Sequence, residues 1–254
     1  MKLLLMGGTK DSVEIGKRLR NLGNIFILYT STTNYGGKLG EEFADDVITK
    51  PLDKNELKDV VKEYNIDILV DATHPFAINA SKNAIDVCKE LNIKYVRFER
   101  KKEKIEHPNV IYVKDFVEAA KYAKKANKVF HMAGIKNLKT VVDIVGEDKV
   151  IARVLPISVN EALKILPQKN IVAMYGTFSK ELNKYLIKDY GCDAIITKDS
   201  GESGGFEEKV YGALEAGAKV IVVERPKLNY PIYFDDVDEL VNYIKNLILV
   251  VSRK

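Results

Sequence analysis

The chain has 254 residues, 46% hydrophobic and 30% charged, which is enough to bury one large core or two smaller ones without disulfides. Its formal net charge of +4 is too small to indicate a nucleic-acid-binding protein. The two cysteines, Cys88 and Cys192, are far apart and have no Cys or His at metal-ligand spacing, which predicts reduced, buried thiols and no metal site.

The apolar part of the N-terminal segment is too short for a signal peptide. No stretch of the chain approaches the roughly 20 apolar residues that a membrane-spanning helix needs. We therefore expect a cytoplasmic protein that binds neither membrane nor nucleic acid. The sequence leaves the oligomeric state open.

In the first half, short apolar runs alternate with stretches of helical period, which is the pattern of repeated βα units and a parallel sheet. Strands are predicted at residues 2–6, 24–29, 47–48, 66–70 and 94–98, and helices at about residues 11–22, 53–64 and 78–91. Asp53, with Glu56 three residues later, has the capping-box spacing and is the expected N-cap of the second of these helices.

After a charged run and Pro108 the alternation begins again. Strands are predicted at residues 110–113, 129–132, 150–154, 171–174, 194–197 and 219–223, and helices at about 115–126, 158–166, 179–189, 206–216 and 236–249. The sequence thus predicts an α/β protein with two doubly wound, Rossmann-like parallel sheets, residues 1–98 and 99–254, and a cleft between them. Ligand contacts are expected where strands end and helices begin.

The first such turn contains Gly7, Gly8 and Thr9. Glycines there allow backbone N–H groups to approach a phosphate, and the following helix adds its positive end. The turn does not match Gly-x-Gly-x-x-Gly, because Thr9 and Ser12 occupy the second and third glycine positions. We predict a nucleotide site, with a tight turn that binds no ligand as the alternative.

The second strand is followed by hydroxyl and amide side chains, including Thr32, and then by Lys38. A site selective for NAD usually offers Asp or Glu to the ribose hydroxyls at this point. The missing carboxylate removes a repulsion that a 2′-phosphate would feel, and Lys38 supplies a positive charge. The pattern favours NADPH over NADH, and a polar surface loop is the alternative.

The fourth strand leads into Asp71-Ala72-Thr73-His74-Pro75-Phe76-Ala77. Pro75 fixes the backbone and restricts His74 to an extended conformation. Histidine can donate a hydrogen bond or a proton near neutral pH. The position of His74 after a strand favours a functional residue, and a structural histidine is the alternative.

Two turns of the second half have similar chemistry: residues 175–179 and residues 197–205. Their glycines, hydroxyls and backbone donors, together with Lys198, suit a carboxylate or a phosphate. Neither Ser179 nor Ser200 lies in Gly-x-Ser-x-Gly, so neither is predicted to be a nucleophile, and Ser179 is the expected N-cap of a helix. His131 is expected to pack in the core and His107 to be exposed.

Taken together, these turns resemble the precorrin-6A reductases of cobalamin biosynthesis. The resemblance rests on Gly7-Gly8-Thr9, Asp71-Ala72-Thr73-His74-Pro75-Phe76-Ala77, Arg97-Phe98-Glu99-Arg100, Gly176-Thr177-Phe178-Ser179, Thr197-Lys198-Asp199-Ser200-Gly201 with Gly204-Gly205 and Lys209, and Glu224-Arg225-Pro226. It implies an oxidoreductase that uses NADPH to reduce one C=C bond of a corrinoid-precursor macrocycle, precorrin-6A or cobalt-precorrin-6A, to the dihydro product 6B. It implies no metal or flavin for the protein itself.

The resemblance and the turns together give the expected site residues. The cofactor is expected at Gly7, Gly8, Thr9, Thr32, Lys38 and Thr73. The substrate, a tetrapyrrole-derived macrocycle with many carboxylates, is expected at His74, Phe76, Arg97, Arg100, Lys198, Ser200 and Gly201, with Lys101 and Lys102 as further cations. His74 is the candidate proton donor, and Asp71 is expected to hold its turn.

Three points stay open. The family's second strand commonly leads to a small-residue run with an arginine, where this chain has Tyr35-Gly36-Gly37-Lys38, so NADH remains possible. A non-catalytic NADP-binding sensor is the alternative function, and a methyltransferase that uses S-adenosylmethionine is a weaker third. The sequence does not decide whether the substrate carries cobalt.

Overall fold

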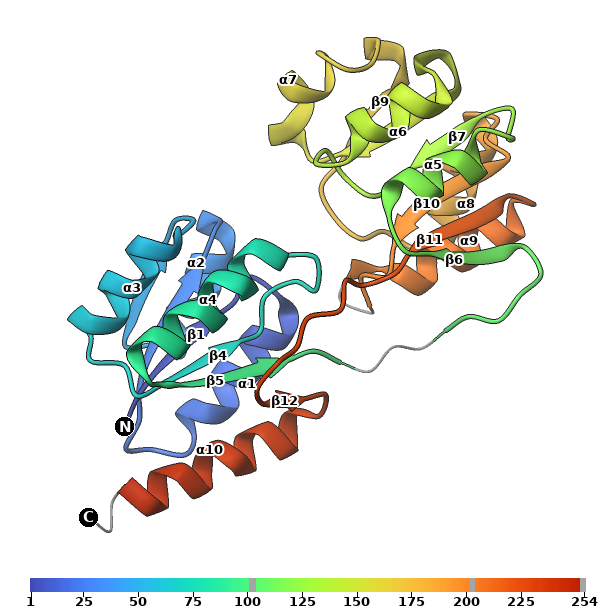
Figure 1. Cartoon of the computed structure of the whole chain (residues 1–254). Helices are drawn as coiled ribbons and strands as arrows, with labels where there is room; N and C mark the ends of the chain where they lie inside the picture. The colour runs from blue at the N-terminus through green and yellow to red at the C-terminus, as the bar shows by residue number, and fades with distance from the viewer. Residues whose placement is uncertain (101–103, 202–203, 252–254) are drawn as a thin grey trace. The chain divides into compact units, whose positions relative to one another are not determined.

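The structure, a computed structural model, describes residues 1–100, 104–201 and 204–251 (Figure 1). The chain divides into two compact units, the first formed by Met1–Lys101 with Lys227–Lys254 and the second by Lys102–Pro226. Each unit contains one six-stranded sheet. All the strand pairs are parallel, which confirms the prediction of two parallel-sheet α/β units.

The first sheet has the strand order β12-β5-β4-β1-β2-β3. Its strands are β1 (Lys2–Met6), β2 (Phe26–Ser31), β3 (Asp46–Thr49), β4 (Ile68–Asp71), β5 (Lys94–Phe98) and β12 (Tyr233–Phe234). The chain runs outward from β1 through β2 to β3 and then returns to β4 on the other side of β1. This reversal creates a topological switch point between β1 and β4, where open parallel sheets usually bind ligands.

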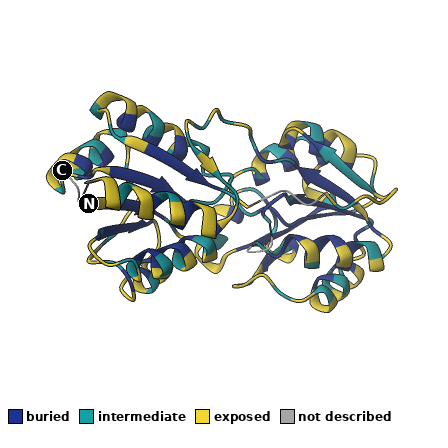
Figure 2. Cartoon of the chain, turned by 90° about the horizontal axis from the view of Figure 1, so that it is seen from below, coloured by how far each residue is buried: buried dark blue, intermediate teal, exposed yellow. Residues whose placement is uncertain are grey.

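Helices cover both faces of this sheet because each presents an apolar stripe to it. They are α1 (Lys10–Arg20), α2 (Asn34–Gly40), α3 (Lys54–Glu63), α4 (Ile78–Leu91) and α10 (Val237–Val251). Ile15 and Leu19 of α1 and Leu240 of α10 bury against one face, and Leu57 of α3 and Val87 of α4 against the other. Figure 2 shows the resulting pattern of buried strands and partly exposed helices. Asp53 caps α3 in the predicted capping box.

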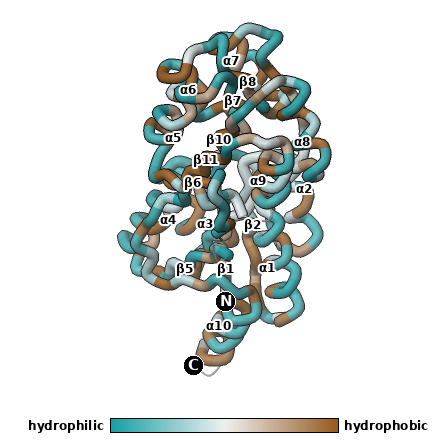
Figure 3. The backbone as a smooth tube through the Cα atoms, turned by 90° about the vertical axis from the view of Figure 1, so that its right-hand side faces the viewer, coloured by the Kyte–Doolittle hydropathy of each residue, from teal (hydrophilic) through white to brown (hydrophobic). Residues whose placement is uncertain are grey.

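The C-terminal residues differ from the expected division, which placed residues 99–254 in one domain. Residues 227–254 belong to the first unit. The physical reason is that β12 adds to the edge of the first sheet beside β5, and α10 packs beside α1 (Figure 1). Along α10 hydrophobic and hydrophilic residues alternate (Figure 3), and the apolar ones include the buried Val237, Leu240 and Ile244.

A second difference follows β2. The strand continues to Ser31, and residues 34–40, where no helix was predicted, form α2. Thr33 caps this helix by accepting the Gly36 N–H, 3.1 Å. The three glycines of α2, poor helix formers in isolation, allow it to lie directly against neighbouring side chains, since a Cβ on Gly40 would overlap the Tyr29 ring.

The second sheet has the order β6-β11-β10-β7-β8-β9. Its strands are β6 (Val110–Val113), β7 (Val129–His131), β8 (Val150–Val154), β9 (Ile171–Ala173), β10 (Ala194–Lys198) and β11 (Lys219–Val223). The chain goes outward from β7 to β9 and returns to β10 on the other side of β7. The switch point of this unit therefore lies between β7 and β10.

The helices of the second unit are α5 (Phe116–Ala123), α6 (Leu138–Val145), α7 (Val159–Ala162), α8 (Lys180–Asp189) and α9 (Phe206–Glu215). Helix α6 was not predicted, because its β-branched residues have low helix propensity. Its signal was the spacing of Leu138, Val141, Val142 and Val145, which places all four on one buried face. Helix α7 is shorter than the predicted 158–166 and follows a 3₁₀ turn, Pro156–Ser158.

Cys88 and Cys192 are both free and buried, as predicted. Within the described ranges, none of the helices is long and apolar enough to cross a lipid bilayer.

Candidate functional site

The turn after β1 is built around a buried tyrosine. A Cβ on Gly7 would overlap the ring of Tyr29, a fully buried residue of β2. The Tyr29 hydroxyl accepts the Gly8 N–H, 2.8 Å, and is 3.0 Å from the Ser12 hydroxyl. Gly7 is thus required for packing, whatever ligand the turn binds.

The hydrogen bonds of this turn show which donors remain for a ligand. Gly7 N–H donates to Thr30 O and Gly8 N–H to Tyr29, so neither is available to a phosphate. Thr9 caps α1 in a reciprocal box with Ser12. Helix geometry leaves the N–H groups of Lys10 and Asp11 without an intrahelical acceptor. The anion-binding capacity of the turn therefore lies in the first residues of α1 rather than in the two glycines.

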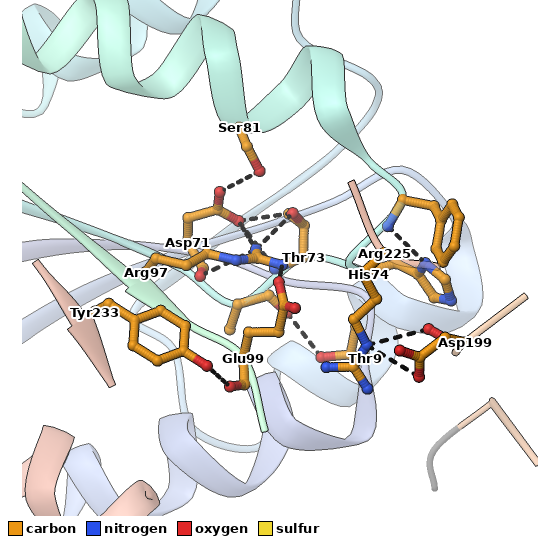
Figure 4. Close-up of polar contacts among 12 residues, drawn as sticks. Thr9, Asp71, Thr73, His74, Ser81, Arg97, Glu99, Asp199, Arg225 and Tyr233 are labelled. Atoms are coloured by element: carbon orange, nitrogen blue, oxygen red, sulfur yellow. Dashed lines mark hydrogen bonds and ion pairs between the residues drawn. The ribbon is translucent and has the colours of Figure 1, made fainter. Parts of the chain in front are cut away.

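The turns after β1 and β4 meet at the switch point of the first unit. Thr9 Oγ1 donates to Ala72 O over 2.8 Å, which joins the expected cofactor turn to the turn that carries His74 (Figure 4). In the sheet register Met6 lies beside Asp71. Two of the turns predicted to carry chemistry are thus adjacent.

Asp71 organises the second of these turns. Its fully buried carboxylate accepts from Thr73 N and Oγ1, at 3.0 and 2.6 Å, from Ser81 Oγ at 2.6 Å and from Tyr95 OH at 2.7 Å. It also accepts from Arg97 Nη1 at 2.8 Å. Burial alone would raise the Asp71 pKa, but the Arg97 charge and the hydroxyl donors outweigh it and hold the pKa below its usual value. Asp71 is therefore an ionised anchor.

Arg97 is placed differently from its expected role as a substrate-binding residue. Its guanidinium is fully buried, with Nη1 on Asp71 and Nη2 on Glu99 Oε2, 2.9 Å (Figure 4). Tyr230 covers it, with its ring centre 5.5 Å from the guanidinium carbon. The Arg97 Nε is buried without a hydrogen-bond partner, and the whole side chain is fully buried, so Arg97 supports the site from behind.

His74 lies on the turn with its ring 5.9 Å from that of Phe76, and both residues are partly exposed. His74 Nδ1 accepts the Phe76 N–H, 3.2 Å. An accepting Nδ1 carries no proton, so the neutral ring has its proton on Nε2. The turn thus fixes the tautomer of His74.

The other expected residues of the first unit are more exposed. Thr32 follows β2, and Lys38 lies on α2 with an exposed side chain. Arg100 donates from Nε to Asp11, 2.6 Å, and from Nη2 to Glu14, 2.7 Å. Arg100 therefore places a positive charge at the first turn of α1, beside the helix end available to an anion. Lys101 and Lys102 lie outside the described residues.

In the second unit, the turn after β10 lies at the switch point. Lys198 is the last residue of β10, with its Nζ 6.0 Å from the centre of the Phe116 ring. Burial, with the Lys136 charge, lowers its pKa to about 8. Ser200 is buried, and Gly201 has φ +69° with the Arg225 guanidinium against it. Arg225 Nε donates to Asp199 O, 3.1 Å, which braces the turn.

The histidine and serine assignments agree with expectation. His131 is buried, with Nε2 2.9 Å from Gly134 O, and burial lowers its pKa to about 4, so it is neutral. His107 is exposed. Ser179 caps α8 by accepting the Leu182 N–H, 3.2 Å.

Two buried cations of the second unit received no role from the sequence. Arg153 lies on β8 and donates from Nη1 to Asn183 Oδ1, 2.7 Å. Lys209 lies on α9 and donates to Gly204 O, 2.7 Å. The signal for Arg153 was a charge inside an otherwise apolar strand, and for Lys209 a lysine one turn after a glycine-rich loop.

Across the described parts of the chain, no cluster of three or more His, Cys, Asp or Glu residues is arranged to hold a metal ion.

Comparison with known proteins gives a consistent match. A family model described as "Precorrin-6x reductase CbiJ/CobK" matches residues 2–245. A protein of Methanocaldococcus jannaschii named cobalt-precorrin-6A reductase is 86% identical over 247 residues, which cover 97% of this chain and 99% of the relative. A protein of the same name from Methanococcus maripaludis is 52% identical over 250 residues, covering 97% of this chain and all of the relative.

Among solved structures, a chain titled "CobK precorrin-6A reductase" superposes with a TM-score of 0.77 at 20% identity, covering 97% of both chains. At this identity the likeness shows the fold.

Proposed function

Because this chain belongs to the precorrin-6x reductase family, we propose that it reduces one C=C bond of cobalt-precorrin-6A, with NADPH as the reductant, to give the dihydro product in cobalamin biosynthesis. The family makes the chain an oxidoreductase. When bound, NADPH supplies a hydride to one carbon of the bond, and a proton must reach the other.

The observation that carries this proposal is the junction at the switch point of the first unit. There the start of α1, a place suited to an anion, is tied by Thr9 to the turn of His74. A hydride-transfer enzyme needs its reactants oriented more than it needs a nucleophile. Two hydrogen-bonded turns built on buried strands meet that requirement.

The residues fit a nicotinamide dinucleotide in their donor chemistry. The N–H groups of Lys10 and Asp11 would meet the diphosphate, and Arg100 neutralises the Asp11 carboxylate that would otherwise repel it. Thr32 and Lys38 would meet the ribose end, where Lys38 favours a 2′-phosphate. Gly7 and Gly8 shape the turn that follows β1. Thr73 belongs to the neighbouring turn after β4, which Thr9 joins to the first one.

For the substrate, we propose that His74 and Phe76 contact the macrocycle and that Lys198, Ser200 and Gly201 meet its carboxylates. The Phe76 N–H occupies Nδ1, which leaves Nε2 as the nitrogen free to reach the substrate. To donate a proton, the ring would first take one up at Nδ1 and so give up the Phe76 hydrogen bond. Arg97 is left out of this set because its guanidinium is buried and paired.

Cobalt in the substrate is supported by the relatives at 86% and 52% identity, since both are named cobalt-precorrin-6A reductase. In this proposal cobalt belongs to the substrate and not to the protein.

An anaerobic assay tests the proposal. The full chain is incubated with cobalt-loaded or metal-free precorrin-6A and with NADPH or NADH, and nicotinamide oxidation is followed with the macrocycle spectrum. We expect turnover with the cobalt-loaded substrate and a higher kcat/KM for NADPH. Equal kcat/KM values for the two nucleotides would remove the NADPH preference. Nucleotide binding without oxidation would instead favour an NADP-binding sensor.

A further inference from the structure

Two buried cations face the carboxyl edge of the second sheet from different elements. Arg153 on β8 and Lys209 on α9 are each 8% exposed. Their hydrogen-bond partners are neutral: an amide oxygen of Asn183 and the carbonyl of Gly204. Among the described residues neither forms an ion pair with a carboxylate. Because burying a cation without a counter-charge costs free energy, the fold alone gives no reason to keep both.

Arg153 is held in a defined orientation. The Asn183 amide that accepts from its Nη1 also donates through Nδ2 to Ser179 O, 2.8 Å. On its other side the guanidinium lies 5.3 Å from the centre of the Phe178 ring. Among the described residues only Nη1 has a hydrogen-bond partner, so with respect to these residues the remaining N–H groups are oriented but unused.

Contacts between the two turns bring Lys209 into the same region. Lys209 donates to Gly204 O, and Gly205 follows directly. A Cβ on Gly205 would lie 2.8 Å from Thr177 Cβ, so Gly205 touches the turn 175–179 against which Arg153 is fixed. The two cations therefore border backbone segments that touch each other at Gly205 and Thr177.

Ser200 adds an unsatisfied donor to this patch. It is 6% exposed, and its Oγ has no hydrogen-bond partner. A Cβ on Gly204 would overlap Ser200 Oγ, so the hydroxyl lies against the segment that Lys209 holds. Buried hydroxyls normally find an acceptor, and a bound anion would supply one here.

The charges around Lys209 also favour a bound anion. Burial, with the charges of Arg153 and Lys198, lowers the Lys209 pKa to about 7, and Glu208 acts in the opposite sense. Two cations and one carboxylate therefore act on the Lys209 ammonium. The loop also leads directly into α9, whose N-terminal end adds positive potential.

We propose that Arg153, Lys209 and the Ser200 hydroxyl form a subsite for a carboxylate group of the ligand. A guanidinium suits a carboxylate in bidentate geometry, while an ammonium and a hydroxyl add single donors. The identity of the molecule that bears the carboxylate rests on the proposed function. The anion subsite itself rests only on the contacts given above.

Direct binding tests the subsite separately from the reductase activity. The probes are tricarballylate, a small flexible polycarboxylate, and NADP⁺, each titrated into the full chain by calorimetry. The variants are Arg153→Met, Lys209→Met and Ser200→Ala. Lys139→Met is the matched control, because it removes one positive charge from an exposed pair with Asp143 in the same unit.

We expect tricarballylate to bind about tenfold more weakly to Arg153→Met and Lys209→Met, less weakly to Ser200→Ala, and unchanged to Lys139→Met. NADP⁺ affinity should not change. Where Arg153→Met fails to fold by circular dichroism, Ser200→Ala, which removes no charge, decides. Unchanged tricarballylate binding in the folded variants would overturn the subsite.

Two other outcomes separate the hypotheses. Loss of NADP⁺ affinity with tricarballylate affinity retained would assign the cations to a nucleotide phosphate and overturn the carboxylate assignment. Carboxylate binding as expected, in a protein that oxidises no NADPH with either macrocycle, would leave the subsite standing while the proposed function fails.

Discussion

Arg97 donates through Nη1 to Asp71 Oδ1 over 2.8 Å, and both side chains are fully buried. The same carboxylate oxygen accepts from the Thr73 N–H and hydroxyl. One ion pair inside the first sheet therefore sets the backbone of the turn that carries His74. The pair is a support for the candidate site, because neither partner can reach a ligand.

Arg97→Met should lower the free energy of unfolding by about 3–5 kcal/mol, because it leaves the Asp71 carboxylate buried without its counter-charge. Urea unfolding followed by circular dichroism measures the loss. The matched control is Lys58→Met, which breaks the partly exposed pair with Glu90 and should cost less than about 1 kcal/mol. A similar small cost for Arg97→Met would show that the buried pair does not hold the turn.

Acid should remove the contribution of Asp71. Its folded-state pKa is below the ordinary 3.8, so the native state binds fewer protons than the unfolded state between the two pKa values. The stabilisation is thus complete above about pH 4 and is lost as the pH falls through the folded-state pKa. The stability difference between the natural protein and Asp71→Asn should narrow over this range, and a constant difference would contradict the assignment.

Gly7→Ala tests whether the first turn is shaped by packing. The added Cβ would overlap the fully buried Tyr29 ring, and we expect a loss of about 1–3 kcal/mol in unfolding free energy. Gly23→Ala is the comparison: its φ of +65° carries the backbone strain, but no atom lies within 4 Å of the new Cβ. If Gly7→Ala costs no more than Gly23→Ala, the Tyr29 contact does not explain the glycine.

The pattern of strands and helices could be predicted because each strand is apolar and each helix has a clear stripe, so β1, β5, β6, β8 and β11 have the predicted bounds. Two features could not. The return of β12 and α10 to the first unit depends on a two-residue edge strand and on a partner surface far away in sequence. Helix α2 depends on glycines that are unfavourable until Tyr29 and Thr49 are in place.

The sequence could predict which turns form the site, but not the role of each side chain in them. The strand ends and their glycines located the switch points, as general topology requires. Arginine chemistry suggested that Arg97 binds substrate. In the structure β5 pairs with β4 so that Arg97 lies beside Asp71, and its side chain donates to that carboxylate. Arg153 was missed because one charge in an apolar strand has no spacing to recognise, and only its neighbours Asn183 and Phe178 show its use.

Lys209→Met should stabilise the protein most at acid and neutral pH. The folded-state pKa is about 7 against an ordinary 10.5, so below about pH 7 the natural protein buries a charged lysine. As the pH rises from 7 toward 10.5 the native state loses the proton first, and the penalty fades. Thermal unfolding should show a larger gain at about pH 6 than at about pH 9. A gain that is the same at both would mean that Lys209 is not titrating.

His74 is tested by two substitutions that separate its two nitrogens. Its Nδ1 accepts the Phe76 N–H and holds the turn, while Nε2 carries the proton. His74→Asn places an amide oxygen near the Nδ1 position and can keep that hydrogen bond, whereas His74→Ala loses both functions. If His74 donates the proton, kcat should fall by roughly a hundredfold or more in both variants. If His74 only holds the turn, His74→Asn should retain most of the activity and His74→Ala should mainly raise KM. The split between kcat and KM effects in the two variants decides between these roles.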